Sequence, residues 1–139
     1  MEHPNIPVSI APSEALGRGI FSSSNARKAK NGTVPRRVFL EKWGERTLSV
    51  DRLDCVASET AAALGDSVAA QRNATFHGWA VITAQDAGGS ERRVAVTPLD
   101  LNPYHADIIL PDSAVKEQDE QLRHAQELAD ASRWQSRPR

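Results

Sequence analysis

Residues 102–111, with the sequence NPYHADIILP, form a short apolar run closed at each end by proline. This pattern is typical of a β-strand bounded by turns. Side chains alternate between the two faces of a strand. One face is therefore expected to carry Tyr104, Ala106, Ile108 and Leu110. His105 and Asp107 are expected together on the other face, either as a chemically useful pair or as part of an ordinary solvated strand.

Other segments supply the rest of the predicted framework. Runs rich in β-branched and aromatic residues predict strands at 38–40, 47–50, 75–83 and 93–97. The first two are expected to form a hairpin around Gly44, and the last two a hairpin around residues 86–90. Helical spacing of apolar residues predicts two main helices, over 58–72 and from about 112 to 134, and serine capping predicts a short helix over 22–30.

These elements predict an α+β fold. We expect an antiparallel or mixed sheet of about five strands, with two main helices on one face. The proline-rich residues 1–15 are expected to form an extended N-terminal arm, residues 16–134 a single domain, and residues 135–139 a disordered tail. A chain of 139 residues buries enough surface to fold without a metal or a disulfide.

The composition favours a soluble protein of a reducing compartment. Cys55 is the one cysteine, so the chain has neither an internal disulfide nor a cysteine-based zinc set. No apolar run approaches the ~18 residues of a membrane span, and the N-terminus lacks the pattern of a signal peptide. We therefore expect a cytoplasmic location, no membrane contact and no cofactor.

Charge is segregated along the chain, although the net charge is only −1. Residues 24–46 contain seven Lys and Arg against two Glu, whereas residues 112–130 contain six Asp and Glu against two cations. Such a chain can present a positive face to an acidic surface or a phosphate backbone. The residues expected to contact this partner are Arg27, Lys28, Lys30, Arg36, Arg37 and Trp43. In the alternative interpretation, the two charged segments face each other within the fold.

Two smaller patterns concern anion binding and catalysis. Gly17, Arg18 and Gly19 precede a serine-rich helix start, where exposed amides would hold an anion, unless the glycines only serve a turn. A carboxylate beside an imidazole fixes the tautomer of the ring and raises its basicity, which makes His105 and Asp107 candidate catalytic residues. If His77 lies on a neighbouring strand, the two histidines would divide the acid and base roles. We expect no metal site, because these residues lack the spacing of a metal motif.

Two functions remain open. The absence of a specific catalytic motif and the segregated charge favour a small binding or accessory protein that acts through a protein or nucleic-acid partner. The alternative is a toxin-like, metal-independent ribonuclease or other phosphodiester hydrolase that uses His105, Asp107 and His77. Neither the substrate nor the oligomeric state follows from the sequence, and whether the chain is an enzyme is left open.

Overall fold

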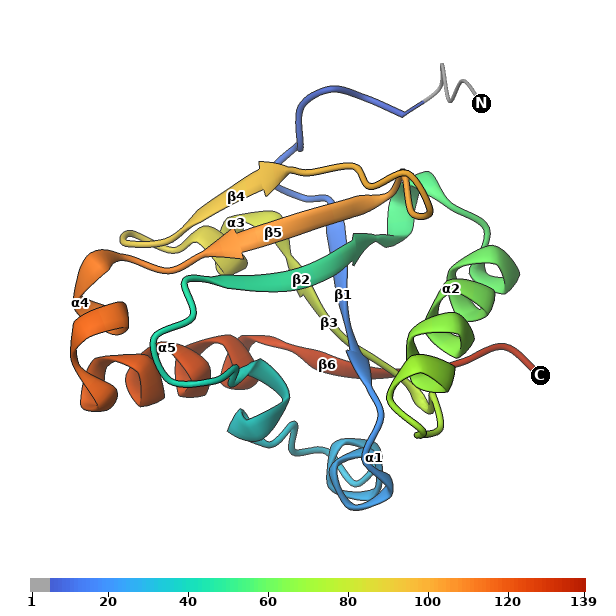
Figure 1. The fold of residues 1–139 in the computed structure, drawn as a ribbon, viewed down its shortest axis with the longest axis horizontal. Helices are drawn as coiled ribbons and strands as arrows, with labels where there is room; N and C mark the ends of the chain where they lie inside the picture. Colours follow the sequence, from blue (N-terminus) through green and yellow to red (C-terminus); the bar gives the residue numbers. More distant parts are fainter. Residues whose placement is uncertain (1–5) are drawn as a thin grey trace.

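Six antiparallel strands form one sheet in the computed structural model, which describes residues 6–139 (Figure 1). Their order across the sheet is β4-β5-β2-β1-β3-β6. The strands are β1 Ala15–Ile20, β2 Thr47–Arg52, β3 Gly78–Thr83, β4 Arg93–Val96, β5 His105–Ile109 and β6 Arg133–Ser136. The predicted α+β class is confirmed, with six strands instead of about five. The first five residues of the predicted arm lie outside the described residues.

Within residues 6–139, five α-helices and two short 3₁₀ helices connect and cover these strands. The α-helices are α1 Ser23–Lys30, α2 Ser58–Gln71, α3 Ala84–Gly88, α4 Asp112–Lys116 and α5 Gln118–Ala131. The 3₁₀ helices are η1 Arg36–Phe39 and η2 Leu53–Cys55. Ser22 caps α1 as predicted, because its hydroxyl accepts a hydrogen bond from the Asn25 amide at 3.3 Å. No helix in the described part of the chain is both long and apolar enough to cross a membrane.

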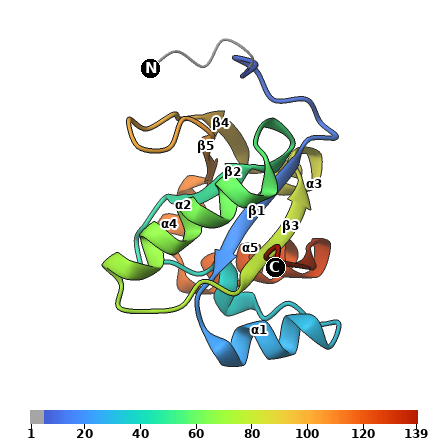
Figure 2. The same ribbon diagram turned by 90° about the vertical axis from the view of Figure 1, so that its right-hand side faces the viewer.

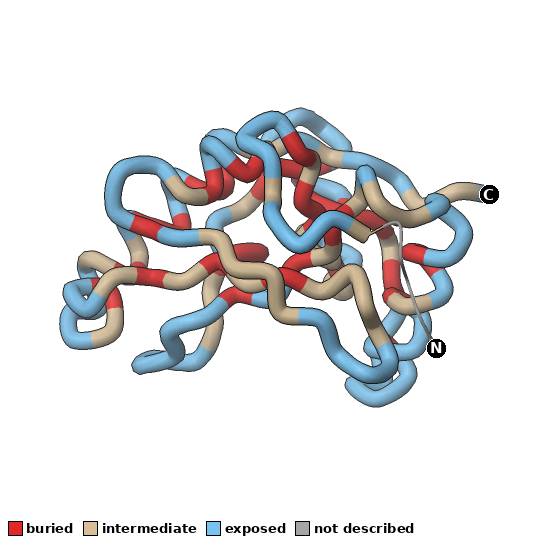
Figure 3. The backbone as a smooth tube through the Cα atoms, turned by 90° about the horizontal axis from the view of Figure 1, so that it is seen from above, coloured by how far each residue is buried: buried red, intermediate tan, exposed pale blue. Residues whose placement is uncertain are grey.

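The larger hydrophobic core fills one face of the sheet. Central strands contribute alternate buried residues to it, namely Leu16, Ile20, Leu48, Val50, Ala106 and Ile108. Phe39 of η1, Leu128 of α5 and two alanines of α1 close the other side of this core. Figure 3 shows buried residues gathered along the middle of the molecule and exposed residues in its outer loops. Burial of these aliphatic side chains is the main favourable term for folding.

A smaller core lies on the opposite face, under α2. Ala61, Ala62 and Ala69 of this helix pack against Phe76, Trp79 and Val81. The two long helices, α2 and α5, therefore cover different faces of the sheet, and they lie on different sides of β1 and β3 in Figure 2. This arrangement corrects the prediction that both main helices share one face. Helical spacing reveals an apolar face of a helix, but it carries no information about which face of a distant sheet that helix covers.

Neither predicted hairpin forms. Residues 36–39 adopt a 3₁₀ helix in place of a strand, with Val38 and Phe39 buried beneath α5. Residues 84–88 form α3, which is capped by the Thr83 hydroxyl accepting from the Asp86 amide. Strands β3 and β4 are consequently separated in the sheet by β5, β2 and β1. In both places tertiary packing outweighs the local turn pattern.

The C-terminal segment also differs from the prediction. The expected long helix divides into α4 and α5 and ends at Ala131, and Trp134 lies in β6. Strand β6 pairs with β3, so Gln135 and Ser136 are ordered strand residues and not part of a disordered tail. This pairing satisfies backbone groups that would otherwise leave β3 as an open edge. Arg137 then ion-pairs with Asp66 of α2 at 2.6 Å.

A buried arginine ties the N-terminal arm to the sheet. The Arg52 guanidinium donates two hydrogen bonds to the Glu14 carboxylate, at 2.7 and 3.0 Å. It also donates to the Pro7 and Ser9 carbonyls at 2.6 and 3.1 Å. These bonds satisfy a charged side chain that is wholly buried. They hold the described part of the arm against the end of β2.

Candidate functional site

A cavity of about 520 Å³ lies between α2 and the sheet, within the size range of small-molecule sites. Gly17 and Gly19 of β1 form part of its wall. A Cβ atom at Gly17 would lie 2.7 Å from Leu53 and 2.8 Å from Trp79, so this position accepts only glycine without rearrangement. The two predicted anion-binding glycines thus line a cavity that the sequence did not reveal.

The wall opens because β1 and β2 separate. They pair only at Leu16 with Arg52 and at Gly17 with Asp51. Past this point the Arg18 guanidinium bridges the strands, donating to the Ser49 carbonyl at 3.0 Å and the Val38 carbonyl at 2.9 Å. It also forms an ion pair with Glu41 at 2.6 Å. Arg18, predicted as an anion ligand, is therefore engaged in holding the two strands and η1 together.

One end of the cavity is polar. Asp51 of β2 stands directly across from His105 of β5, and both line the cavity together with Asn102. The Asn102 amide donates to the Asp51 carboxylate at 2.8 Å, and its carbonyl accepts from the Tyr104 backbone at 3.1 Å. Burial raises the pKa of Asp51, while the hydrogen bond from Asn102 and the nearby His105 oppose that rise.

The tautomer of His105 follows from its hydrogen bonds. Its Nδ1 lies 2.9 Å from the Thr97 carbonyl oxygen and 2.9 Å from the Thr97 hydroxyl. A carbonyl oxygen only accepts, so we assign the proton of the neutral ring to Nδ1 and a lone pair to Nε2. Nε2 lies 3.9 Å from the Asp107 carboxylate, on the same face of β5. This arrangement provides a proton acceptor beside a carboxylate at the cavity wall.

His77 lies apart from this cluster. It precedes β3, and its backbone amide donates to the Ile20 carbonyl at 3.0 Å. Strands β2 and β1 lie between β5 and β3. At the usual spacing between neighbouring strands, β5 and β3 are therefore about 14 Å apart. The hypothesis that His77 and His105 occupy neighbouring strands is therefore wrong. Among residues 6–139, no group of three or more His, Cys, Asp or Glu side chains is arranged to hold a metal ion.

The predicted cationic residues form a second candidate site. The exposed side chains of Arg27, Lys28 and Lys30 on α1 and of Arg36 and Arg37 on η1 are here named the basic surface. Figure 1 shows α1 and the segment that follows it along the lower side of the molecule. None of these five side chains forms an ion pair with a described residue. Trp43, a few residues beyond η1, is 46% exposed.

The acidic segment does not neutralise the basic surface. Its carboxylates pair with other arginines, as in Arg92 with Glu127 at 2.9 Å and Arg123 with Glu120 at 2.6 Å. One ion pair joins the two charged segments, between Arg46 and Asp112 at 2.7 Å. The alternative interpretation, in which the two segments face each other, therefore accounts for Arg46 but not for the five cations of the basic surface.

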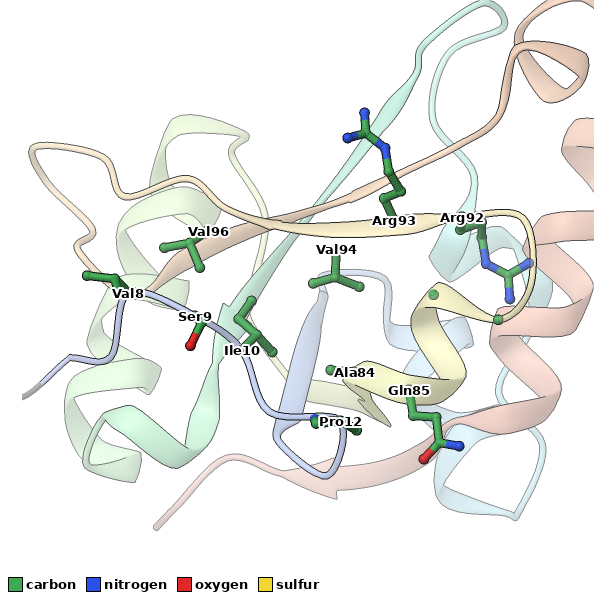
Figure 4. A pocket seen from close by; sticks show the side chains of 12 residues that line it. Val8, Ser9, Ile10, Pro12, Ala84, Gln85, Arg92, Arg93, Val94 and Val96 are labelled. Carbon is green, nitrogen blue, oxygen red and sulfur yellow. The ribbon is translucent and has the colours of Figure 1, made fainter.

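A second hollow, of about 820 Å³, lies where the arm passes over β4 and α3. Figure 4 shows Val8, Ser9 and Ile10 beside Val94 and Val96, with Arg93 pointing away from the hollow. Among its described lining residues the only titratable groups are Arg92 and Arg93. The Arg92 guanidinium is already bound by the Ala87 carbonyl, His124 and Glu127. The hollow thus offers less chemistry than the cavity beneath α2.

Sequence reasoning did not predict Asp51, Asn102 or Arg72 as site residues, although all three line the cavity. In the sequence, Asp51 looks like the end of a strand and Asn102 like part of a proline turn. Only the pairing of β2 with β5 brings these two residues close to His105. Arg72, just after α2, has no sequence signal that distinguishes it from any exposed arginine. No family model, curated protein or solved structure matches this chain. The assignment of function therefore depends on these local geometries.

Proposed function

We propose that the protein is a nucleic-acid-binding module whose basic surface contacts the phosphate backbone. One observation carries the proposal: five exposed cations on α1 and η1 have no carboxylate partner among the described residues. Elsewhere six arginines form ion pairs, namely Arg18, Arg46, Arg52, Arg92, Arg123 and Arg137. A dense set of unpaired cations costs self-repulsion, which an anionic partner relieves.

A phosphate backbone suits this surface better than an acidic protein does. Phosphates repeat at short intervals along a strand, so several cations gain partners at once and release condensed counterions. The exposed indole of Trp43 supplies a face on which an unpaired base can stack. The proposal therefore favours single-stranded nucleic acid, and includes the cytoplasmic location that the single cysteine suggests. An acidic protein partner is the outcome to be excluded.

The hydrolase hypothesis receives less support. A metal-independent ribonuclease of the predicted kind needs an acid and a base within reach of one phosphodiester. His105 and Asp107 lie together, but two strands separate them from the strand that follows His77. Nucleic-acid binding without cleavage is therefore the function that the geometry supports best.

Binding can be measured by fluorescence anisotropy with labelled single-stranded RNA and DNA over a series of salt concentrations. We expect log K to fall with log salt by about 0.7 per phosphate contacted. Arg36→Ala combined with Arg37→Ala removes two unpaired cations and should lower that slope by about 1.4 if both contact phosphates. Trp43→Ala should weaken binding to single strands more than to duplex.

The matched control is Arg93→Ala combined with Lys116→Ala. These two exposed side chains also lack an ion pair among the described residues, so the double variant changes the net charge equally at a different place. Equal losses in both double variants would mean that total charge and not the basic surface governs binding, and would contradict the proposal. So would salt-sensitive binding to an acidic protein with no measurable binding to nucleic acid.

A further inference from the structure

We propose that the cavity beneath α2 binds an elongated organic oxyanion, with its carboxylate or phosphate at Arg72 and a hydroxyl or amino group at Asp51 and His105. This site is independent of the basic surface, because none of the five residues of that surface lines the cavity. The ligand class follows from three features: a cation at one end, hydrogen-bonding groups at the other, and apolar walls between them.

Arg72 provides the cationic end. It lines the cavity, is exposed, and has no carboxylate partner among the described residues. Its guanidinium carbon lies 4.8 Å from the centre of the Phe21 ring, which also lines the cavity. Stacking on an aromatic ring restricts the guanidinium while leaving its edge N–H groups free to donate. Such a group favours a planar carboxylate or a phosphate as its partner.

Asp51 and His105 provide the opposite end. Asn102 occupies one carboxylate oxygen of Asp51, and Thr97 occupies Nδ1 of His105. The remaining carboxylate oxygen and Nε2 are both hydrogen-bond acceptors, and they belong to residues that line the cavity. A ligand hydroxyl or amine donates to such acceptors, whereas a second anion there would be repelled by Asp51. The two ends therefore select different groups on one molecule.

The spacing of the two ends sets the ligand length. Asp51 stands beside Gly17, and Phe21 lies four residues farther along the chain. That separation is about 13 Å at the rise of an extended strand. The rest of the lining is mainly apolar and includes Leu64 and Val68 of α2, Phe76, and the loop residues Leu99 and Leu101. Leu101 is 86% exposed and Leu99 53%. A bound apolar body would cover these two leucines.

The test uses isotope-labelled protein and four probes. The reference probe is para-hydroxyphenylbutyrate, and its methyl ester removes the charge while phenylbutyrate removes the hydroxyl. The fourth probe, para-hydroxyphenylpropyl phosphate, replaces the carboxylate by a phosphate and shows which oxyanion binds better. We expect saturable NMR shifts at residues lining the cavity, and a weaker Kd for the ester and for phenylbutyrate than for the reference probe.

Variants separate the two ends. Arg72→Gln should weaken the reference probe about 10-fold, the value of one charge-assisted hydrogen bond, and leave the ester unchanged. Arg133→Gln, an exposed arginine outside the cavity, should change neither. Asp51→Asn should weaken the reference probe but not phenylbutyrate. Ser49→Phe should block all probes, whereas Thr47→Phe, on the same face of β2 but outside the cavity lining, should block none.

Three results would overturn the proposal. They are the absence of saturable binding by any of the four probes at millimolar concentration, binding that persists in Ser49→Phe, and binding of the reference probe that is unaffected by Arg72→Gln. Thermal unfolding of each variant without probe shows that a loss of binding does not reflect a loss of folding.

Discussion

The two faces of the sheet differ in what covers them. On one face η1, α1 and α5 close over a continuous aliphatic core. On the other, α2 packs through alanines against Phe76 and Trp79 and leaves a cavity between itself and β1. The same strands supply both faces, because side chains alternate along each of them.

Strand β2 illustrates the division. Leu48 and Val50 belong to the larger core and are buried, whereas Ser49 and Asp51 lie on the other face and line the cavity, which Val50 also borders. Because the larger core supplies most of the buried apolar surface, the opposite face can retain a half-buried carboxylate and unfilled space that cost stability. Folding stability therefore depends mainly on the first face, whereas the cavity that we propose to bind an oxyanion lies on the second.

The largest expected contrast comes from two leucines. Leu128 of α5 is 0% exposed in the larger core, so Leu128→Ala should lower the free energy of unfolding by about 2–5 kcal/mol. Leu101, which lines the cavity and is 86% exposed, should change it by less than about 0.5 kcal/mol when replaced by alanine. Urea denaturation followed by circular dichroism measures both. Similar losses in the two variants would contradict the proposed division of the faces.

A smaller contrast is expected from two glycines. At Gly17 an added Cβ would clash with Leu53 and Trp79, so Gly17→Ala should cost about 1–3 kcal/mol through overpacking. At Gly88 of α3 no atom lies within 4 Å of the added Cβ, so Gly88→Ala should be neutral or slightly stabilising. Denaturation midpoints compare the two variants. If Gly17→Ala were equally neutral, the wall of the cavity would be more yielding than its contacts indicate.

Local patterns in the sequence predicted the parts of the fold that depend on local physics. Alternation over 102–111 places Ala106 and Ile108 in the core and His105 and Asp107 on the other face of β5. Helical spacing predicted α2 at 58–72, within one residue of its observed end. The predicted serine cap marks the start of α1, where Ser22 accepts from the Asn25 amide. In each case the determining interactions lie within a few residues of one another.

The remaining features depend on distant contacts. Residues 36–39 have a strand-like composition, but packing of Val38 and Phe39 beneath α5 favours a 3₁₀ helix. Strand β6 forms because β3 offers an unpaired edge to residues 133–136. The cavity likewise requires β1 and β2 to separate after Gly17 and α2 to lie along β1, so no single segment could have revealed Arg72 opposite Asp51.

The smallest expected effect is a change in the pH dependence of stability when either of two aspartates is replaced. Folding shifts the pKa values of these two aspartates in opposite directions. Burial raises the pKa of Asp51 above 3.8, so folding favours its protonated form, and the stability that Asp51 contributes is lost as the pH rises through its folded-state pKa. Asp51→Asn should therefore become more stable relative to wild type as the pH increases from about 3 to 7.

At Asp66, by contrast, the hydrogen bond from Arg137 lowers the pKa below 3.8. Asp66→Asn should therefore cost stability near neutral pH, and this cost should vanish as the pH falls through the folded-state pKa. Melting temperatures of both variants and wild type across the same pH series give the two slopes. Opposite slopes would place Asp51 in a desolvated cavity wall and Asp66 in a solvated ion pair. A flat curve for Asp51→Asn would mean that water reaches this end of the cavity freely, which removes the reason for the raised pKa.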